Sequence, residues 1–136
     1  MNGVEKDKAA IEIHDSTLEV VKSCDEDLVA VVHAYVHRSG GRAGFDGAWG
    51  CWQLTELRFR RGTVSGMGET SSIELLGGRL VLSGETHENA IPLPLEFLGA
   101  SRLELESWND VRVILEGEGV IASVVGPPEN VEEYGP

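Results

Sequence analysis

Long apolar runs are absent from this sequence, and none approaches the roughly 18 residues that a membrane-spanning helix needs. The first residues, Met1 to Lys8, are charged and no apolar segment follows them, so the chain as given shows no secretory signal. We therefore expect a cytoplasmic protein that has no membrane partner.

Cysteine is scarce. Cys24 and Cys51 lie 27 positions apart, and their spacing resembles no metal-binding motif. In a cytoplasmic protein both thiols would stay reduced, with Cys51 serving as a small apolar side chain. The sequence also lacks a nucleophile elbow and a P-loop lysine, so no catalytic signature is found and no cofactor is expected.

Basic residues are few, and their distribution is uneven. Eleven lysines and arginines stand against 23 acidic residues, which gives a net charge of -12. Such a chain repels phosphate backbones and anionic lipids, so we expect no nucleic-acid partner. Five of the basic residues nevertheless fall between positions 38 and 61, where the only acids are Asp46 and Glu56: Arg38, Arg42, Arg58, Arg60 and Arg61.

Amphipathic helical spacing is also missing, whereas short alternating strand patterns recur about every ten residues. This pattern predicts a single all-β domain over residues 1–136, with about 9–11 short strands. We expect an antiparallel two-sheet sandwich, with a flattened β-barrel as the alternative. Residues 1–9 and 127–136 are expected to form flexible tails.

Three hairpins are predicted by placing apolar residues opposite one another on the buried face. The first joins residues 11–14 to 17–20 through Asp15-Ser16, and the second joins 73–76 to 79–82 through Gly77-Gly78. The third joins 103–107 to 111–115. A three-residue loop of Trp108, Asn109 and Asp110 would pair Leu105 with Val113 and Leu103 with Leu115, whereas a two-residue turn would set glutamates against apolar residues.

The remaining strands follow from their composition. Residues 28–37 are apolar on both faces, which is typical of a central strand, and residues 52–60 form the natural return strand. Residues 90–95 contain two prolines and are expected at an edge or in an extended crossover. Residues 119–125 are expected to be the last strand, ended by Gly126-Pro127-Pro128.

The segment between the two strands at 28–37 and 52–60 has an unusual composition. Five of the thirteen residues from Arg38 to Gly50 are glycine, and three of the chain's eight aromatic residues lie in or just after it. Glycine permits a strained backbone, and loops of this length are usually functional or disordered. The rings could fold back to close the end of the sandwich, or they could stay exposed as a stacking surface.

We interpret this segment as the recognition surface of a non-enzymatic binding or protein-interaction module. Ring faces beside planar polar groups suit a protein hot spot or a small polar or aromatic ligand. Trp49 would be the anchor and Arg42 its polar partner. The candidate ligand-binding residues are Arg38, Arg42, Phe45, Asp46, Trp49 and Trp52.

Two alternatives remain open. A metal-dependent enzyme or metal-binding protein could be built on His14, His33 or His37. However, His33 and His37 would lie about 13 Å apart on one strand face, at roughly 3.3 Å per residue, which is too far to share an ion. The protein could also be a structural subunit of a larger assembly, which would then co-purify with its partner.

Overall fold

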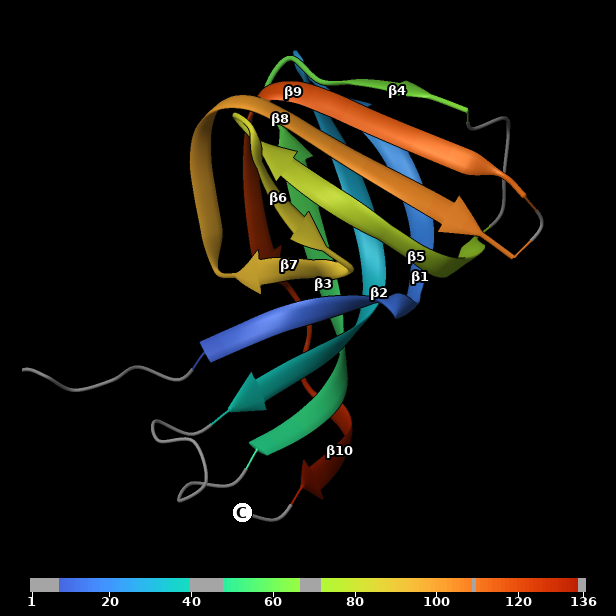
Figure 1. Cartoon of the computed structure of the whole chain (residues 1–136), viewed down its shortest axis with the longest axis vertical. Helices are drawn as coiled ribbons and strands as arrows, with labels where there is room; N and C mark the ends of the chain where they lie inside the picture. The colour runs from blue at the N-terminus through green and yellow to red at the C-terminus, as the bar shows by residue number, and fades with distance from the viewer. Residues whose placement is uncertain (1–7, 40–47, 67–71, 109, 135–136) are drawn as a thin grey trace, which may run out of the picture.

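The chain folds into antiparallel β-strands (Figure 1). The computed structural model describes residues 8–39, 48–66, 72–108 and 110–134, and within these ranges it contains ten strands and no helix. The described residues thus form no helix long and apolar enough to cross a membrane. The strands are β1 (Lys8–Cys24), β2 (Asp27–Ser39), β3 (Ala48–Phe59), β4 (Thr63–Ser65), β5 (Ile73–Leu82), β6 (Glu85–Glu88), β7 (Ala90–Leu93), β8 (Leu95–Ser107), β9 (Arg112–Val124) and β10 (Glu129–Tyr134).

Six of these strands close into a barrel. The order β3-β2-β1-β5-β8-β9 returns to its start because residues 55–59 of β3 also pair with residues 120–124 of β9. Strands β4, β6, β7 and β10 attach outside this ring. The predicted all-β antiparallel class is confirmed, and closure of the sheet corresponds to the flattened-barrel alternative.

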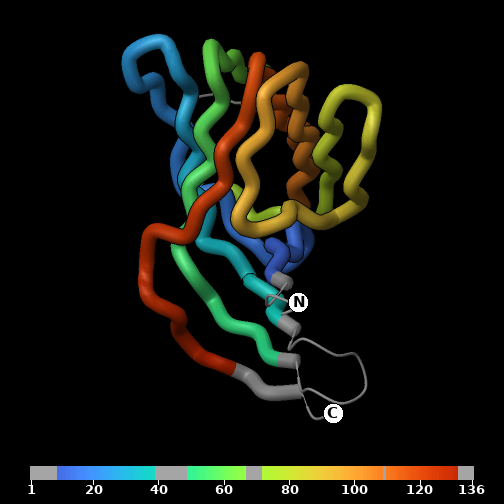
Figure 2. Tube along the Cα trace, turned by 90° about the vertical axis from the view of Figure 1, so that its left-hand side faces the viewer, coloured from blue at the N-terminus to red at the C-terminus, as the bar shows by residue number. Residues whose placement is uncertain are grey.

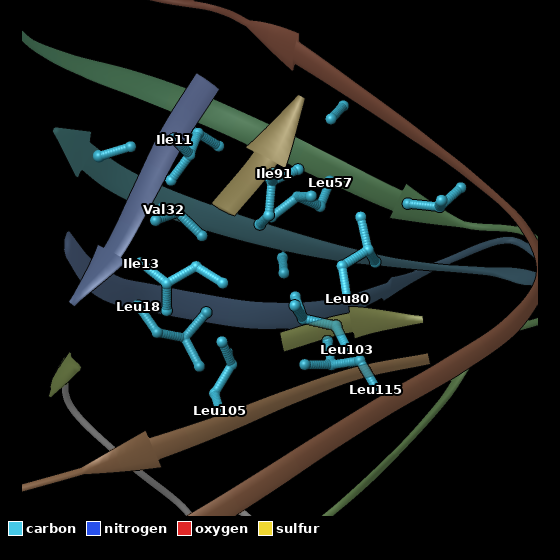
Figure 3. Close-up of a cluster of buried hydrophobic side chains, with 14 of the residues drawn as sticks. Ile11, Ile13, Leu18, Val32, Leu57, Leu80, Ile91, Leu103, Leu105 and Leu115 are labelled. Carbon is cyan, nitrogen blue, oxygen red and sulfur yellow. The ribbon is translucent and has the colours of Figure 1, made fainter. Parts of the chain in front are cut away.

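Apolar side chains fill the barrel (Figure 3). They alternate along the six strands of the ring, so that one face of each of these strands points inward. On β2 the inward residues are all buried, from Leu28 through Val36 at every second position. Among the described residues the largest fully buried side chain is Phe59, near the end of β3.

Two of the predicted hairpins are wrong, because each predicted turn lies inside one long strand. Residues 8–24 form β1, and its pairing with β2 shifts between Glu12 and Thr17. Within this bulge the Ser16 side chain takes the place of a backbone hydrogen-bond partner. Its Oγ accepts a hydrogen bond from the Tyr35 N–H at 3.1 Å and donates one to the Glu12 carbonyl at 2.7 Å. The strand therefore bends without reversing.

The segment Gly77-Gly78 behaves in the same way. Residues 73–82 form β5, which pairs with β8 and has a register shift between Leu75 and Gly77. A Cβ atom at Gly78 would lie 3.1 Å from Leu105 Cδ2 and closer still to the Glu104 carbonyl oxygen. The glycine permits close approach of two strands here, and it does not make a turn.

The third hairpin is confirmed. Strands β8 and β9 pair Leu105 with Val113 and Leu103 with Leu115, the register predicted for the three-residue loop. The Ser107 N–H donates to the Val111 carbonyl at 2.9 Å, and the Val111 N–H donates to Ser107 Oγ at 3.1 Å.

Beyond the barrel, the first part of β1, the end of β2 and the start of β3 continue as an open sheet (Figures 1 and 2). We call this sheet, with β7 and β10 at its edges, the sheet extension. Strand β7 pairs with residues 9–12 of β1 and with no other described strand. It is therefore an edge strand, as the prolines of residues 90–95 predicted. The segment after Pro128, expected as a flexible tail, forms β10 along β3 over residues 129–134.

Candidate functional site

Arg38 and Trp49 lie directly opposite each other in the sheet extension. They are paired across β2 and β3, and the Arg38 guanidinium carbon lies 5.3 Å from the centroid of the Trp49 ring. This distance is that of a cation–π interaction. Both positions belong to strands, whereas the sequence had suggested a loop from residue 38 to residue 50.

This pair is on the face that continues the barrel core. Val36 lies two positions before Arg38, and Cys51 lies two positions after Trp49, so both are on the same face as the pair. Both residues are fully buried. Trp49 is partly buried and packs against the core cluster. The ring is therefore intermediate between the two interpretations offered by the sequence, because it packs partly against the core cluster and remains partly accessible.

A short polar network holds Arg38 in place. Arg38 Nη2 donates to Gln53 Oε1 at 3.1 Å, and Gln53 Nε2 donates to the Gly126 carbonyl at 3.2 Å. Burial raises the pKa of the Cys51 thiol, which stays protonated and points its sulfur at the same Gln53 oxygen, 3.5 Å away. The partner of Arg38 is thus a neutral amide, and within the described residues its charge is not neutralised by a carboxylate.

Trp52 lies on the opposite face of β3. It stacks on His33, with ring centroids 5.5 Å apart, and meets Tyr35 edge-on at 5.2 Å. Gly50 makes room for this cluster, since a Cβ atom there would lie 2.6 Å from Cζ of Tyr35. An aromatic ring covering a glycine on the neighbouring strand is a known way of stabilising a sheet.

The structure therefore brings together only part of the predicted site. Arg38 and Trp49 are adjacent, and Trp52 is separated from them by the thickness of the sheet. Arg42, Phe45 and Asp46 lie outside the described residues. The separation of Trp49 from Trp52 could have been predicted, because residues three apart in a strand point to opposite faces.

The histidines give one possible metal-ligand group in the described part of the chain. Atoms of Glu12, His14 and Asp15 lie within 4.8 Å of one another in the β1 bulge. His14 Nε2 is 3.0 Å from Asp15 Oδ2, while its Nδ1 faces the side-chain amide of Asn89. His33 and His37 belong to no such group among the described residues.

The hydrogen bonds of His14 oppose metal binding by its Nε2 atom. The backbone N–H of His14 donates to Asn89 Oδ1 at 3.0 Å, which orients the Asn89 NH₂ group toward Nδ1 of the ring. Nδ1 is then the acceptor, so the proton is on Nε2 and is donated to Asp15. A metal ion would have to displace that proton, and the arrangement is better explained as a clamp on the bulge.

A mixed-charge pocket lies on the other side of the barrel, over β5, β8 and β9. Its volume is about 370 Å³, and its lining residues are Leu76, Gly77, Gly78, Arg79, Glu88, Glu104, Glu106 and Arg112. Glu104 accepts hydrogen bonds from Arg102 at 2.8 Å and from Arg79 at 3.2 Å. The hydrogen bond from Arg102, helped by the charge of Arg79, holds the pKa of Glu104 below its usual value.

This lowered pKa predicts a pH-dependent contribution to stability. A carboxylate whose pKa is lower in the folded state stabilises the fold at neutral pH, and the contribution is lost as the pH falls through the folded pKa. Glu104→Gln should cost up to about 1 kcal/mol at pH 7, as for other partly exposed ion pairs. Urea unfolding at a series of pH values should show this cost shrinking below the usual pKa of 4.5.

Glu106→Gln provides the control, because Glu106 pairs with one exposed arginine, Arg112, and is itself 51% exposed. We expect a smaller cost for this variant. A Glu104→Gln cost that did not change between pH 7 and pH 3 would contradict the role assigned to the charge of Glu104.

The arrangement around Arg38 can bind an anion beside an aromatic ring. The guanidinium group has five N–H donors, and Gln53 accepts from one of its nitrogens. Trp49 offers the apolar surface next to it. Comparison of the chain with protein-family models, with curated proteins and with solved structures found no match.

Proposed function

We propose that this protein is a non-enzymatic binding module whose recognition surface is the segment from Arg38 to Trp52. The barrel interior supports this placement, because it is filled by apolar side chains (Figure 3) and a ligand would have to bind outside it. The sheet extension carries the segment beyond the barrel.

The single observation that carries the proposal is the Arg38–Trp49 pair. In a chain with a net charge of -12, most arginines of the described region form ion pairs with carboxylates, as Arg58, Arg79, Arg102 and Arg112 do. Arg38 instead contacts an amide and an indole ring. A guanidinium group in this setting suits a carboxylate on a partner protein or on a small aromatic ligand.

Benzoate is a suitable probe, because it joins a carboxylate to an aromatic ring, and benzamide is its neutral analogue. In a titration followed by NMR, benzoate should shift the indole resonance of Trp49 and benzamide should not. Arg38→Gln should weaken benzoate binding about tenfold or more, since a hydrogen bond to a charged group contributes about 1.5 to 3 kcal/mol.

Arg112→Gln is the matched control. It makes the same change of charge at an exposed arginine that pairs with Glu106 at 2.9 Å, and it should leave benzoate binding unchanged. Equal responses to benzoate and benzamide, or equal losses in the two arginine variants, would refute the proposal. Thermal unfolding of Arg38→Gln separates loss of binding from loss of the Gln53 contact.

A further inference from the structure

An apolar patch on the outer face crosses the three neighbouring strands β1, β2 and β3 and the residue that follows β9. Strands β1 and β2 place Val20 opposite Val31, β2 and β3 place His33 opposite Leu54, and the Val125 N–H donates to the Leu54 carbonyl at 2.9 Å. Figure 2 shows β3 lying beside the end of β9 in this region. The outer patch consists of Val20, Val31, His33, Trp52, Leu54 and Val125.

The patch is accessible as well as continuous. Val20 is 41% exposed, Leu54 is 38% exposed and Val125 is 51% exposed. Single exposed apolar residues are common on protein surfaces, whereas large contiguous apolar patches mark interaction sites. Stacking on His33 and contact with Tyr35 hold the Trp52 ring in one orientation, which lowers the entropy lost when a partner binds it.

Acidic side chains border the patch. Glu56 pairs with Val31 across β2 and β3, and Glu129 pairs with Trp52 across β3 and β10. The Glu129 carboxylate lies 3.5 Å from Nε2 of His33 and is 60% exposed. Lys22 and Arg58 are on the same face, in the row through Val29, but the chain as a whole has a net charge of -12, so a partner with basic residues fits this face better than a second copy does.

The backbone geometry limits what can bind. Residues 29–36 of β2 are paired with strands on both sides apart from the β1 bulges, and residues 55–59 of β3 are paired with both β2 and β9. Trp52 pairs with β10, and the Leu54 carbonyl accepts from the N–H groups of Val125 and Gly126, so these backbone groups are used within the sheet. A partner strand could not add hydrogen bonds over this face. A helix satisfies its own backbone and packs through side chains alone.

We propose that the outer patch binds an amphipathic helix of a partner protein that combines apolar residues with lysine or arginine. The apolar residues pack on Leu54, Val125 and Trp52, and the basic residues pair with Glu56 and Glu129. This surface is on the opposite face of β3 from Arg38 and Trp49. Trp52 belongs both to the outer patch and to the segment of the function proposed above, but the helix experiment does not depend on the benzoate experiment.

A synthetic helix of about 18 residues, with leucines on one face and lysines on the other, is the probe. A peptide of the same composition in scrambled order controls for charge alone. The test variant is Leu54→Glu with Val125→Glu. The matched control is Leu76→Glu with Leu98→Glu, which adds the same charge at residues that are 41% and 76% exposed and lie outside the patch.

We expect the amphipathic peptide to bind the unmodified protein, and to bind the Leu54→Glu/Val125→Glu variant at least about tenfold more weakly, as for loss of interface anchors. The control variant should keep its affinity within about twofold, the tolerance expected for surface changes outside the interface. Glu56→Gln with Glu129→Gln should reduce the salt dependence of binding without adding any bulk.

Three results would overturn the proposal. The scrambled peptide could bind equally well, the two glutamate variants could lose affinity equally, or the peptide could fail to bind. Sedimentation of the free protein adds a further test, because a dimer that dissociates in the Leu54→Glu/Val125→Glu variant would assign the patch to a second copy. Circular dichroism of each variant shows whether it is folded.

Discussion

Phe59→Ala is expected to reduce the free energy of unfolding by about 3 to 5 kcal/mol, the usual loss for a fully buried large aromatic side chain. Phe59 has no exposed surface and pairs with Leu28 of β2 and Val120 of β9. It therefore lies where β3 joins both of its neighbours and closes the barrel.

The surroundings of Phe59 cannot collapse easily into the space that alanine would leave. Gly62 and Gly117 both lie close to Phe59. A Cβ atom at Gly62 would be 2.7 Å from Cβ of Phe59, and one at Gly117 would be 3.0 Å from it. These close backbone contacts already fill the corner, so the cavity should persist and the cost should be near the upper end of the range.

Urea unfolding followed by circular dichroism measures this effect. Leu98→Ala is the control, because Leu98 is 76% exposed and its loss should cost no more than about 0.5 kcal/mol. A cost below about 1 kcal/mol for Phe59→Ala, a value typical of surface changes, would show that β3 and β9 do not close the barrel as described.

The parts of the fold that were predictable from sequence are those in which neighbouring segments pair. Strands β2 and β3, a central strand and its return strand, pair without a register shift from Leu28–Phe59 to Ser39–Ala48, and the β8–β9 hairpin has the register expected from matching Leu105 with Val113. In the β8–β9 hairpin the alternation of apolar residues and the length of the loop point to the same register, whereas for β2 and β3 the order along the chain predicts the pairing.

The two wrong hairpins show where local patterns are insufficient. Asp15-Ser16 and Gly77-Gly78 carry turn chemistry, and the flanking residues would pair well across a tight turn. Bulged strands use the same residue types, since glycine and small polar residues let the chain bend or let a neighbour approach. Closing a six-stranded barrel requires long bent strands, and that requirement arises from distant pairings such as β3 with β9.

The same reason explains which parts of the candidate surfaces the sequence missed. The proximity of Leu54 to Val125 depends on contact between segments about 70 positions apart, and alternation within either strand does not reveal it. By contrast, the pairing of Arg38 with Trp49 follows from the β2–β3 register alone. A residue's face can be predicted from local spacing, whereas its neighbours on that face depend on the topology.

Trp49→Ala is expected to cost about 2 to 3 kcal/mol, less than the 3 to 5 kcal/mol lost with a fully buried large aromatic residue. The ring is partly buried against the core cluster, so its removal exposes apolar surface of that cluster. It also supports the guanidinium group of Arg38, and that contact disappears with it.

The measurement is the same urea titration, with Trp49→Phe as the conservative variant that keeps an aromatic ring beside Arg38. We expect Trp49→Phe to recover most of the stability and part of the benzoate response. A cost within about 1 kcal/mol for Trp49→Ala would be typical of a surface residue and would contradict the packing described here. A cost of about 5 kcal/mol, as for a completely enclosed ring, would mean that Trp49 serves as a core plug, and the main reason for placing recognition at this segment would be lost.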